Sequence, residues 1–136
     1  VKLLKGSGWN STSYDPFVNK DVKVSDLGKF DLITAFEVFE HVPDVNALMS
    51  DITNLLALNG IIFFSTMLSD RDILKSGRLT WWYASPRNGH ISLFSHASLK
   101  QLGGKYGLNY GCASNVFHFM WTVIPEWAKN LQVHSS

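Results

Sequence analysis

The sequence predicts an α/β fold built on an open, mostly parallel sheet. Two apolar runs typical of buried parallel strands, residues 30–36 and 61–65, flank a segment whose apolar residues recur every three or four positions. A strand, helix, strand order with short connections is typical of a right-handed parallel crossover. Residues 108–113 and 116–124 predict an antiparallel hairpin at the C-terminal end of this sheet.

The N-terminal part predicts a short helix followed by two strands. Residues 1–5 form a helical tail, and the run from Trp9 to Tyr14 has the composition of a strand. Asp15-Pro16 closes that run, because proline has no N–H to donate to a β-ladder. Residues 22–24 predict a second, brief strand before the long apolar run begins.

The helix after Pro43-Asp44 has the clearest period in the chain. Its apolar residues step by three and four and so mark one face. They are Val45, Leu48, Met49, Ile52, Leu55 and Leu56. Asn59-Gly60 ends this helix and leads into the strand at residues 61–65.

Residues 67–94 have no clean period and predict a long loop or small insertion, a kind of segment that often carries function. Ser95 is placed to cap a second helix, and Gly107 to end it in the left-handed conformation. Leu99, Leu102 and Tyr106 mark the inward face of this helix. From Pro125 onward the sequence predicts a tail or a short helix.

Length and composition limit the classes of protein. The 136 residues suit a single domain, residues 1–136, and 46% hydrophobic against 17% charged residues indicates a folded, soluble chain. A net charge of +1 with no basic stripe argues against nucleic acid as a partner.

Further sequence features predict a cytoplasmic protein with no membrane-spanning segment. The chain shows neither a signal peptide nor an apolar run of membrane-spanning length, and the single Cys112 excludes an internal disulfide. The five histidines show no HxxxH or HxH pairing, so the sequence predicts no metal.

Three passages carry a family resemblance. The first runs from Gly8 to Pro16, and the second, at residues 30–44, reads FDLITAFEVFEHVPD. The third joins residues 58–65 to residues 89–95. Together they resemble the class I methyltransferases that use S-adenosylmethionine, especially the small-molecule group similar to the ubiquinone-biosynthesis O-methyltransferases.

The resemblance implies a Rossmann-like methyltransferase sheet that lacks its first strand. In that family the first strand and its Gly-rich cofactor turn precede the passages found here, and Gly6-Ser7-Gly8 lies before the second-strand passage, so it is no substitute. We expect the gap to be closed by direct strand pairing, by another copy in a homo-oligomer, or by the remainder of a longer, N-terminally truncated protein.

The resemblance also implies S-adenosylmethionine as the cofactor. Asp15, with Pro16, would bind the ribose, Asp26 and Leu27 would contact adenine, and Ala35, Phe36 and Glu37 would line the cofactor at the end of a strand. Each assignment has a plainer alternative. Asp15 suits an Asp-Pro turn, Asp26 a surface turn, and Phe36 an ordinary core position.

Methyl transfer needs positioning of the reactants and, for a hydroxyl acceptor, a base. His41 and His90 are the candidate catalytic bases, since a histidine pKa lies near neutrality. The candidate substrate pocket comprises His41, Trp81, Trp82, Tyr83 and His90. Alternatively, His41 orients the turn before Pro43, His90 binds loop backbone, and the aromatic residues cap the core or fill a dimer interface.

The predicted function is S-adenosylmethionine-dependent methyl transfer to a small-molecule acceptor. Without the Gly-rich turn the chain is expected to bind cofactor poorly on its own. Whether this truncated chain is an active or an inactive methyltransferase therefore stays open. The alternative is a non-catalytic, methyltransferase-like interaction or assembly module. A hydrolase or oxidoreductase is disfavoured, because the sequence has neither a GxSxG elbow nor a dinucleotide fingerprint.

Overall fold

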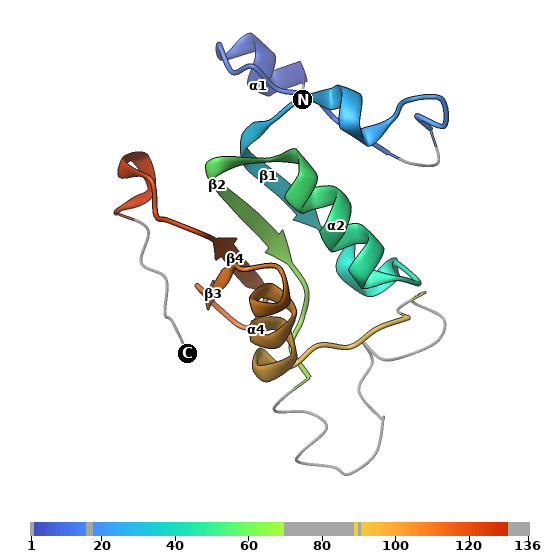
Figure 1. The fold of residues 1–136 in the computed structure, drawn as a ribbon, viewed down its shortest axis with the longest axis vertical. Coiled ribbons are helices and arrows are strands. Elements are labelled where there is room, and N and C mark those ends of the chain that lie inside the picture. The colour runs from blue at the N-terminus through green and yellow to red at the C-terminus, as the bar shows by residue number, and fades with distance from the viewer. Residues whose placement is uncertain (1, 16–17, 70–88, 90, 131–136) are drawn as a thin grey trace.

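A four-stranded mixed sheet forms the centre of the protein in a computed structural model that describes residues 2–15, 18–69, 89 and 91–130 (Figure 1). Its strands are β1 (Phe30–Phe36), β2 (Leu56–Ser65), β3 (Asn109–Cys112) and β4 (Phe117–Trp121), in the order β1-β2-β4-β3. β1 and β2 are parallel, whereas β4 runs antiparallel to both β2 and β3. The predicted α/β class, with a parallel crossover followed by an antiparallel hairpin, is confirmed.

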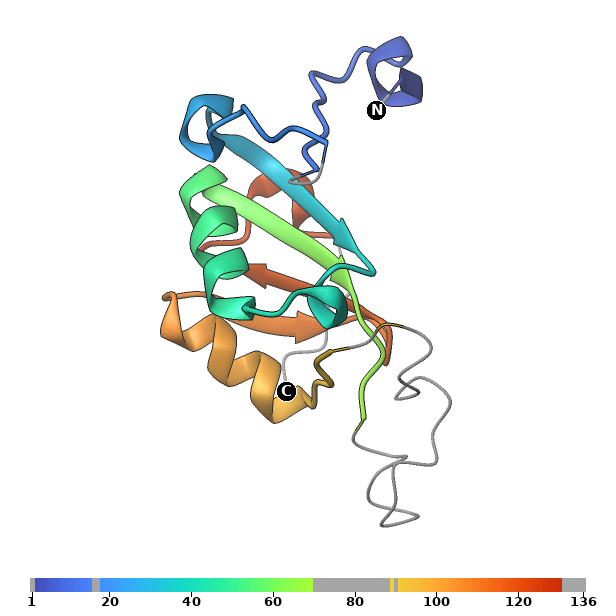
Figure 2. The ribbon, with the colours of Figure 1, turned by 90° about the vertical axis from the view of Figure 1, so that its right-hand side faces the viewer.

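Two helices, α2 (Val45–Leu55) and α4 (His96–Lys105), cover one face of this sheet (Figure 2). The Asp44 side chain caps α2 by accepting hydrogen bonds from two backbone N–H groups of the first turn. Ser95 caps α4 in a reciprocal arrangement with Ser98. Both predicted helix starts are therefore confirmed. In the described part of the chain, no helix combines the length and apolar character needed to cross a membrane.

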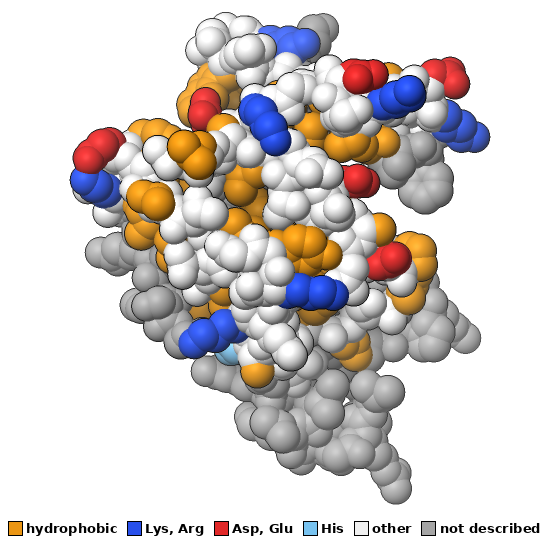
Figure 3. Space-filling view, in the orientation of Figure 1, with side chains coloured by type: hydrophobic (Ala, Val, Ile, Leu, Met, Phe, Trp, Pro, Cys, Tyr) orange, Lys and Arg blue, Asp and Glu red, His pale blue; other side chains and the backbone are white. Residues whose placement is uncertain are grey.

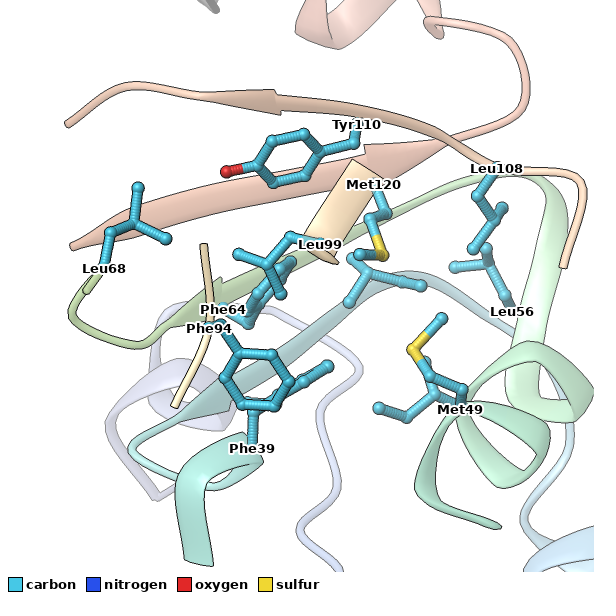
Figure 4. Close-up of a cluster of buried hydrophobic side chains, with 13 residues drawn as sticks. Phe39, Met49, Leu56, Phe64, Leu68, Phe94, Leu99, Leu108, Tyr110 and Met120 are labelled. Carbon is cyan, nitrogen blue, oxygen red and sulfur yellow. The ribbon is translucent and has the colours of Figure 1, made fainter. Parts of the chain in front are cut away.

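The main core lies between these helices and the sheet (Figure 4). Its fully buried side chains come from strands, helices and the segment after β1. They include Phe39, Met49, Ile62, Phe64, Leu99 and Met120. Phe39 stacks on Phe64 with ring centroids 4.4 Å apart. Charged side chains are scattered over the outside of the helical layer, with no large patch of one sign (Figure 3).

The opposite face of the sheet carries a row of phenylalanines, which we call the aromatic face (Phe36, Phe63, Phe117 and Phe119). Phe63 stacks on Phe119 at 4.6 Å and meets Phe36 edge-on at 5.0 Å. A short 3-10 helix, η5 (Glu126–Ala128), covers part of this face through Ala128. Phe36 and Phe117 remain 48% and 43% exposed. The described residues therefore cover this face incompletely.

The N-terminal region differs from the prediction. The helix α1 (Lys2–Gly6) confirms the helical tail, but neither Trp9 to Tyr14 nor residues 22–24 form a strand, and the 3-10 helix η1 (Val24–Leu27) precedes β1 instead. A strand needs a partner for its backbone N–H and C=O groups. Within the described ranges, β1 pairs only with β2, so its outer edge stays open and the two predicted N-terminal strands are wrong.

Gly60 lies within β2, where the strand packs closely against Leu56 and β1. The sequence placed the end of the helix at Asn59-Gly60, whereas α2 ends at Leu55 and the register of β2 against β1 shifts before Ile61. A Cβ atom on Gly60 would lie 2.6 Å from Leu56 Cδ1 and 3.0 Å from the Phe30 carbonyl oxygen. A larger residue would force the Leu56 side chain to move and would crowd the Phe30 carbonyl of β1.

Candidate functional site

The candidate site lies at the carboxyl end of β1, the edge at which open α/β sheets usually bind ligands. β1 ends at Phe36, and the chain turns through Glu37 into the 3-10 helix η2 (Phe39–His41). Glu37 adopts a φ of 53°, a left-handed conformation that non-glycine residues rarely adopt. This sharp turn brings three titratable residues of one short segment together.

A serine at the end of β2 holds Glu37 in this conformation. The Glu37 backbone N–H donates to Ser65 Oγ at 2.9 Å, and Ser65 Oγ lies 3.1 Å from Glu37 Oε1, to which it donates. Phe36 and Ser65 are register partners in the parallel β1–β2 pair. The neighbouring strand therefore fixes both the backbone and the carboxylate of Glu37.

Glu37, Glu40 and His41 form a compact cluster, in which one ligand atom from each residue lies within 4.8 Å of the others. Glu40 is fully buried, whereas Glu37 and His41 are exposed. Carboxylate oxygens and imidazole nitrogens are ordinary ligands of divalent metals, so this cluster has the donor chemistry to hold one. The sequence-based prediction of no metal rested on pairs of histidines and did not consider the Glu-x-x-Glu-His spacing, and it stays a prediction.

His41 connects the cluster to Gly89. Its Nδ1 lies 3.0 Å from the Gly89 carbonyl oxygen, which can only accept, so this nitrogen carries a proton in the contact. The Ile91 and Ser92 N–H groups donate to the Glu40 carbonyl at 2.6 and 3.2 Å. These contacts agree with the interpretation of His41 as an orienting residue, and its role as a base stays a prediction.

The predicted cofactor residues fall into two groups. Ala35, Phe36 and Glu37 lie together at the carboxyl end of β1, with Ala35 buried and the other two exposed. Asp26 and Leu27 lie in η1, before the amino end of the same strand (Figure 2). At about 3.3 Å per residue, β1 separates the two groups by roughly 20 Å. The structure does not bring Asp26 and Leu27 to the edge that carries Phe36.

Asp15 lies in a turn, exposed to solvent. Its carbonyl accepts from the Val18 and Asn19 N–H groups at 3.1 and 2.7 Å, and its own N–H donates to Asn19 Oδ1 at 2.9 Å. This arrangement matches the turn interpretation, and ribose binding stays a prediction. Four predicted pocket residues and one cofactor residue lie outside the described part of the chain: Trp81, Trp82, Tyr83, His90 and Pro16.

Sequence reasoning also missed a buried polar network on the other half of the sheet. His118 Nε2 lies 2.8 Å from the Thr66 carbonyl oxygen, and His118 Nδ1 lies 2.9 Å from the Tyr110 hydroxyl. Burial lowers the pKa of His118 below its ordinary value. Thr66 and His118 are 52 positions apart in the chain, so no local motif signals this contact.

Comparison with known proteins gives one family and a consistent set of relatives. A family model described as "Methyltransferase domain" matches residues 1–112. The chain is 43% identical to the ubiquinone biosynthesis O-methyltransferase of Glaesserella parasuis serovar 5 (strain SH0165), over 32% of this chain and 19% of that protein. It is 51% identical to that of Pasteurella multocida (strain Pm70), over 29% and 16%.

A third relative shows a longer match at lower identity. The ubiquinone biosynthesis O-methyltransferase of Colwellia psychrerythraea (strain 34H / ATCC BAA-681) is 33% identical over 42% of this chain and 23% of its own length. The chain therefore spans less than a quarter of the length of these three relatives.

Proposed function

The chain belongs to the class I S-adenosylmethionine-dependent methyltransferases, and from this premise we propose that it forms part of an O-methyltransferase acting on a hydroxyl group of a small molecule. The names of the relatives support the choice of oxygen as the methylated atom. One structural observation carries the proposal. An exposed apolar ring, Phe36, and the polar cluster of Glu37, Glu40 and His41 share the carboxyl end of β1.

Part of the described chain fits the cofactor of this family. S-adenosylmethionine supplies a methyl group on a positively charged sulfur and also carries an adenosyl group. The exposed ring of Phe36 offers an apolar surface at the ligand-binding edge, and the Glu37 carboxylate offers negative charge beside it. We therefore assign cofactor contact to Phe36 and Glu37. Asp26 and Leu27 are not assigned to this contact, because they precede the other end of β1.

The acceptor side requires a group that takes up the hydroxyl proton. His41 suits this role chemically, because an imidazole nitrogen with a lone pair can accept a proton. Its contact with the Gly89 carbonyl orients the ring from the Nδ1 side. Small-molecule acceptors would then bind beside this cluster.

Calorimetric titration with S-adenosylhomocysteine tests the cofactor assignment. We expect Phe36→Ser to weaken binding roughly 2- to 12-fold, since one aromatic contact contributes about 0.5–1.5 kcal/mol. Phe117→Ser is the matched control, because Phe117 is a similarly exposed phenylalanine of the aromatic face and has no assigned cofactor contact. Absence of binding to the unaltered chain at near-millimolar ligand would contradict autonomous cofactor binding.

A second candidate function, a non-catalytic assembly module, is favoured by the open edge of β1. In the described ranges this edge has no strand partner, and Leu32 and Phe36 on the same strand are exposed. An identical strand from a second copy would satisfy the backbone groups and cover these side chains. Light scattering should then show a dimer that Leu32→Lys disrupts. A monomer at all concentrations would refute this candidate.

A further inference from the structure

We propose that Ser65 is a positioning residue of the candidate site, whose hydroxyl holds the left-handed turn at Glu37 and thereby sets the affinity of the site for its cofactor. The proposal joins three observations: two hydrogen bonds made by one buried hydroxyl, an unfavourable backbone conformation, and fixed residues on both sides of it. The claim about affinity rests on the cofactor contact of Glu37 proposed above. The claim about geometry does not.

The Ser65 hydroxyl is the acceptor for the backbone of the turn. An amide carries one hydrogen, and that of Glu37 is directed at Ser65 Oγ over 2.9 Å. The hydroxyl proton of Ser65 then points to Glu37 Oε1, 3.1 Å away. Ser65 is 3% exposed, so water has little access to its oxygen. A further contact of the Glu37 side chain does not replace this backbone bond, because the single amide hydrogen is already engaged.

The turn at Glu37 lies between two fixed residues. On one side, Phe36 is the register partner of Ser65 in the parallel β1–β2 pair. On the other side, Phe39 is fully buried and stacks on Phe64 with ring centroids 4.4 Å apart (Figure 4). Only two residues separate these fixed positions. A change of conformation at Glu37 can therefore stay local while the sheet and the core persist.

Glu37 does not favour its conformation by itself. Its φ of 53° is left-handed, and a residue with a Cβ atom disfavours that conformation roughly 5- to 30-fold relative to the right-handed one. Two hydrogen bonds to Ser65, one of them to a carboxylate, are together strong enough to outweigh this preference. Without the Ser65 hydroxyl, the left-handed conformer should become the minor one.

Relaxation of Glu37 would open the candidate site. The Glu37 carboxylate would leave the position that Ser65 gives it, whereas η2 would stay anchored through Phe39. The cluster with Glu40 and His41 would then lose one member. The apparent affinity of a ligand falls with the fraction of molecules in the binding conformation. The affinity for the cofactor should therefore drop roughly 5- to 30-fold, the factor by which the relaxed conformer is favoured.

Nuclear magnetic resonance and calorimetry on the full chain test the proposal. In Ser65→Ala, the φ-dependent scalar couplings of the Glu37 amide should leave the values of the left-handed region. Calorimetric titration of the same variant with S-adenosylhomocysteine should show the roughly 5- to 30-fold loss of affinity. Ser65→Thr keeps a hydroxyl group and should retain both the couplings and the affinity of the unaltered chain.

Ser69→Ala is the matched control. Ser69 is also a buried serine, and its hydroxyl donates to the Phe94 carbonyl at 3.0 Å, away from Glu37. Loss of this hydrogen bond should lower the stability of the fold. It should leave the Glu37 couplings and the affinity unchanged, so the control separates a general loss of stability from a loss of positioning.

Three results would overturn the proposal: unchanged couplings or affinity in Ser65→Ala, an equal loss of affinity in Ser69→Ala, or loss of the left-handed signal in Ser65→Thr. Should Ser65→Ala fail to fold, its combination with Glu37→Gly gives the second test, because glycine adopts a positive φ without being held there. The double variant should fold, and its failure to fold would also overturn the proposal. The couplings are measured without ligand. A chain that binds no S-adenosylhomocysteine would therefore refute the cofactor contact, while the couplings still decide the claim about geometry.

Discussion

The two faces of the sheet differ in how completely they are covered, and consecutive residues of β2 show the contrast. Phe64 points into the core beneath α2 and α4 and is fully buried, whereas Phe63 belongs to the aromatic face and is only partly buried. Both residues belong to β2, and they lie in different environments because successive side chains of a strand point to opposite faces of the sheet. The comparison indicates that the helical face stabilises the fold, while the aromatic face retains exposed surface beside the candidate site.

The largest effect that tests this comparison is expected from Phe64→Ala. Removal of a fully buried ring that stacks on Phe39 should cost about 3–5 kcal/mol of unfolding free energy, which urea denaturation measures. Phe63→Ala on the aromatic face is the matched control and should cost clearly less, because part of that ring is already exposed. Equal losses for the two variants would contradict the comparison.

A further effect on the helical face is the pH dependence of stability. Because burial lowers the pKa of His118 in the folded state, the unfolded chain binds the proton first as the pH falls. The stabilising contribution of His118 is fully present above about pH 6.5, the ordinary pKa of a histidine in the unfolded chain. It is lost as the pH falls from there towards the lower pKa of His118 in the folded chain. Urea denaturation at several pH values measures it. His118→Gln should remove this component of the slope, and an unchanged slope would refute its assignment to His118.

On the aromatic face, Phe36→Ser should cost about 1–2 kcal/mol. Phe36 makes edge contacts with Phe63 and Phe117, each worth roughly 0.5–1.5 kcal/mol, but it leaves no closed cavity when removed because it is half exposed. Thermal unfolding measures the change. A loss as large as that of Phe64→Ala would show that the aromatic face is part of the structural core.

The smallest effect is expected on the outside of α4. Gly104→Ala should stabilise the protein by about 0.5–1 kcal/mol, because a Cβ atom there meets nothing within 4 Å and alanine favours the helix. Gly103 is the matched control, since its Cβ would lie 3.3 Å from the Leu108 carbonyl oxygen and 3.5 Å from Met120. Gly103→Ala should gain less or destabilise. Equal gains at both positions would contradict the assigned orientation of α4.

Local sequence signals were sufficient for the elements of the helical face. Asp44 and Ser95 have side chains that accept N–H groups of the first helical turn, and Gly107 adopts the predicted left-handed conformation, with a φ of 71°. The apolar period of α2 correctly identified Met49 and Ile52 as buried. Each of these features depends on residues within a few positions of one another, so the sequence displays it directly.

The features that the sequence did not predict depend on distant partners. Trp9 to Tyr14 has strand composition but pairs with no strand in the described part of the chain. The candidate site itself was predicted in part, since Phe36, Glu37 and His41 were named. Its support by Ser65 and the network around His118 were missed, because strand pairing creates these contacts across more than two dozen positions.

The backbone conformation of Glu37 in the candidate site lowers the stability of the protein. A left-handed conformation costs a residue with a Cβ atom about 1–2 kcal/mol, a cost that glycine does not incur. Selection for stability alone would therefore favour glycine at this position, and an engineering effort guided by stability would choose Glu37→Gly early. That change would relax the turn and remove the carboxylate at the same time. At this residue, a more stable fold and an intact candidate site therefore require different side chains.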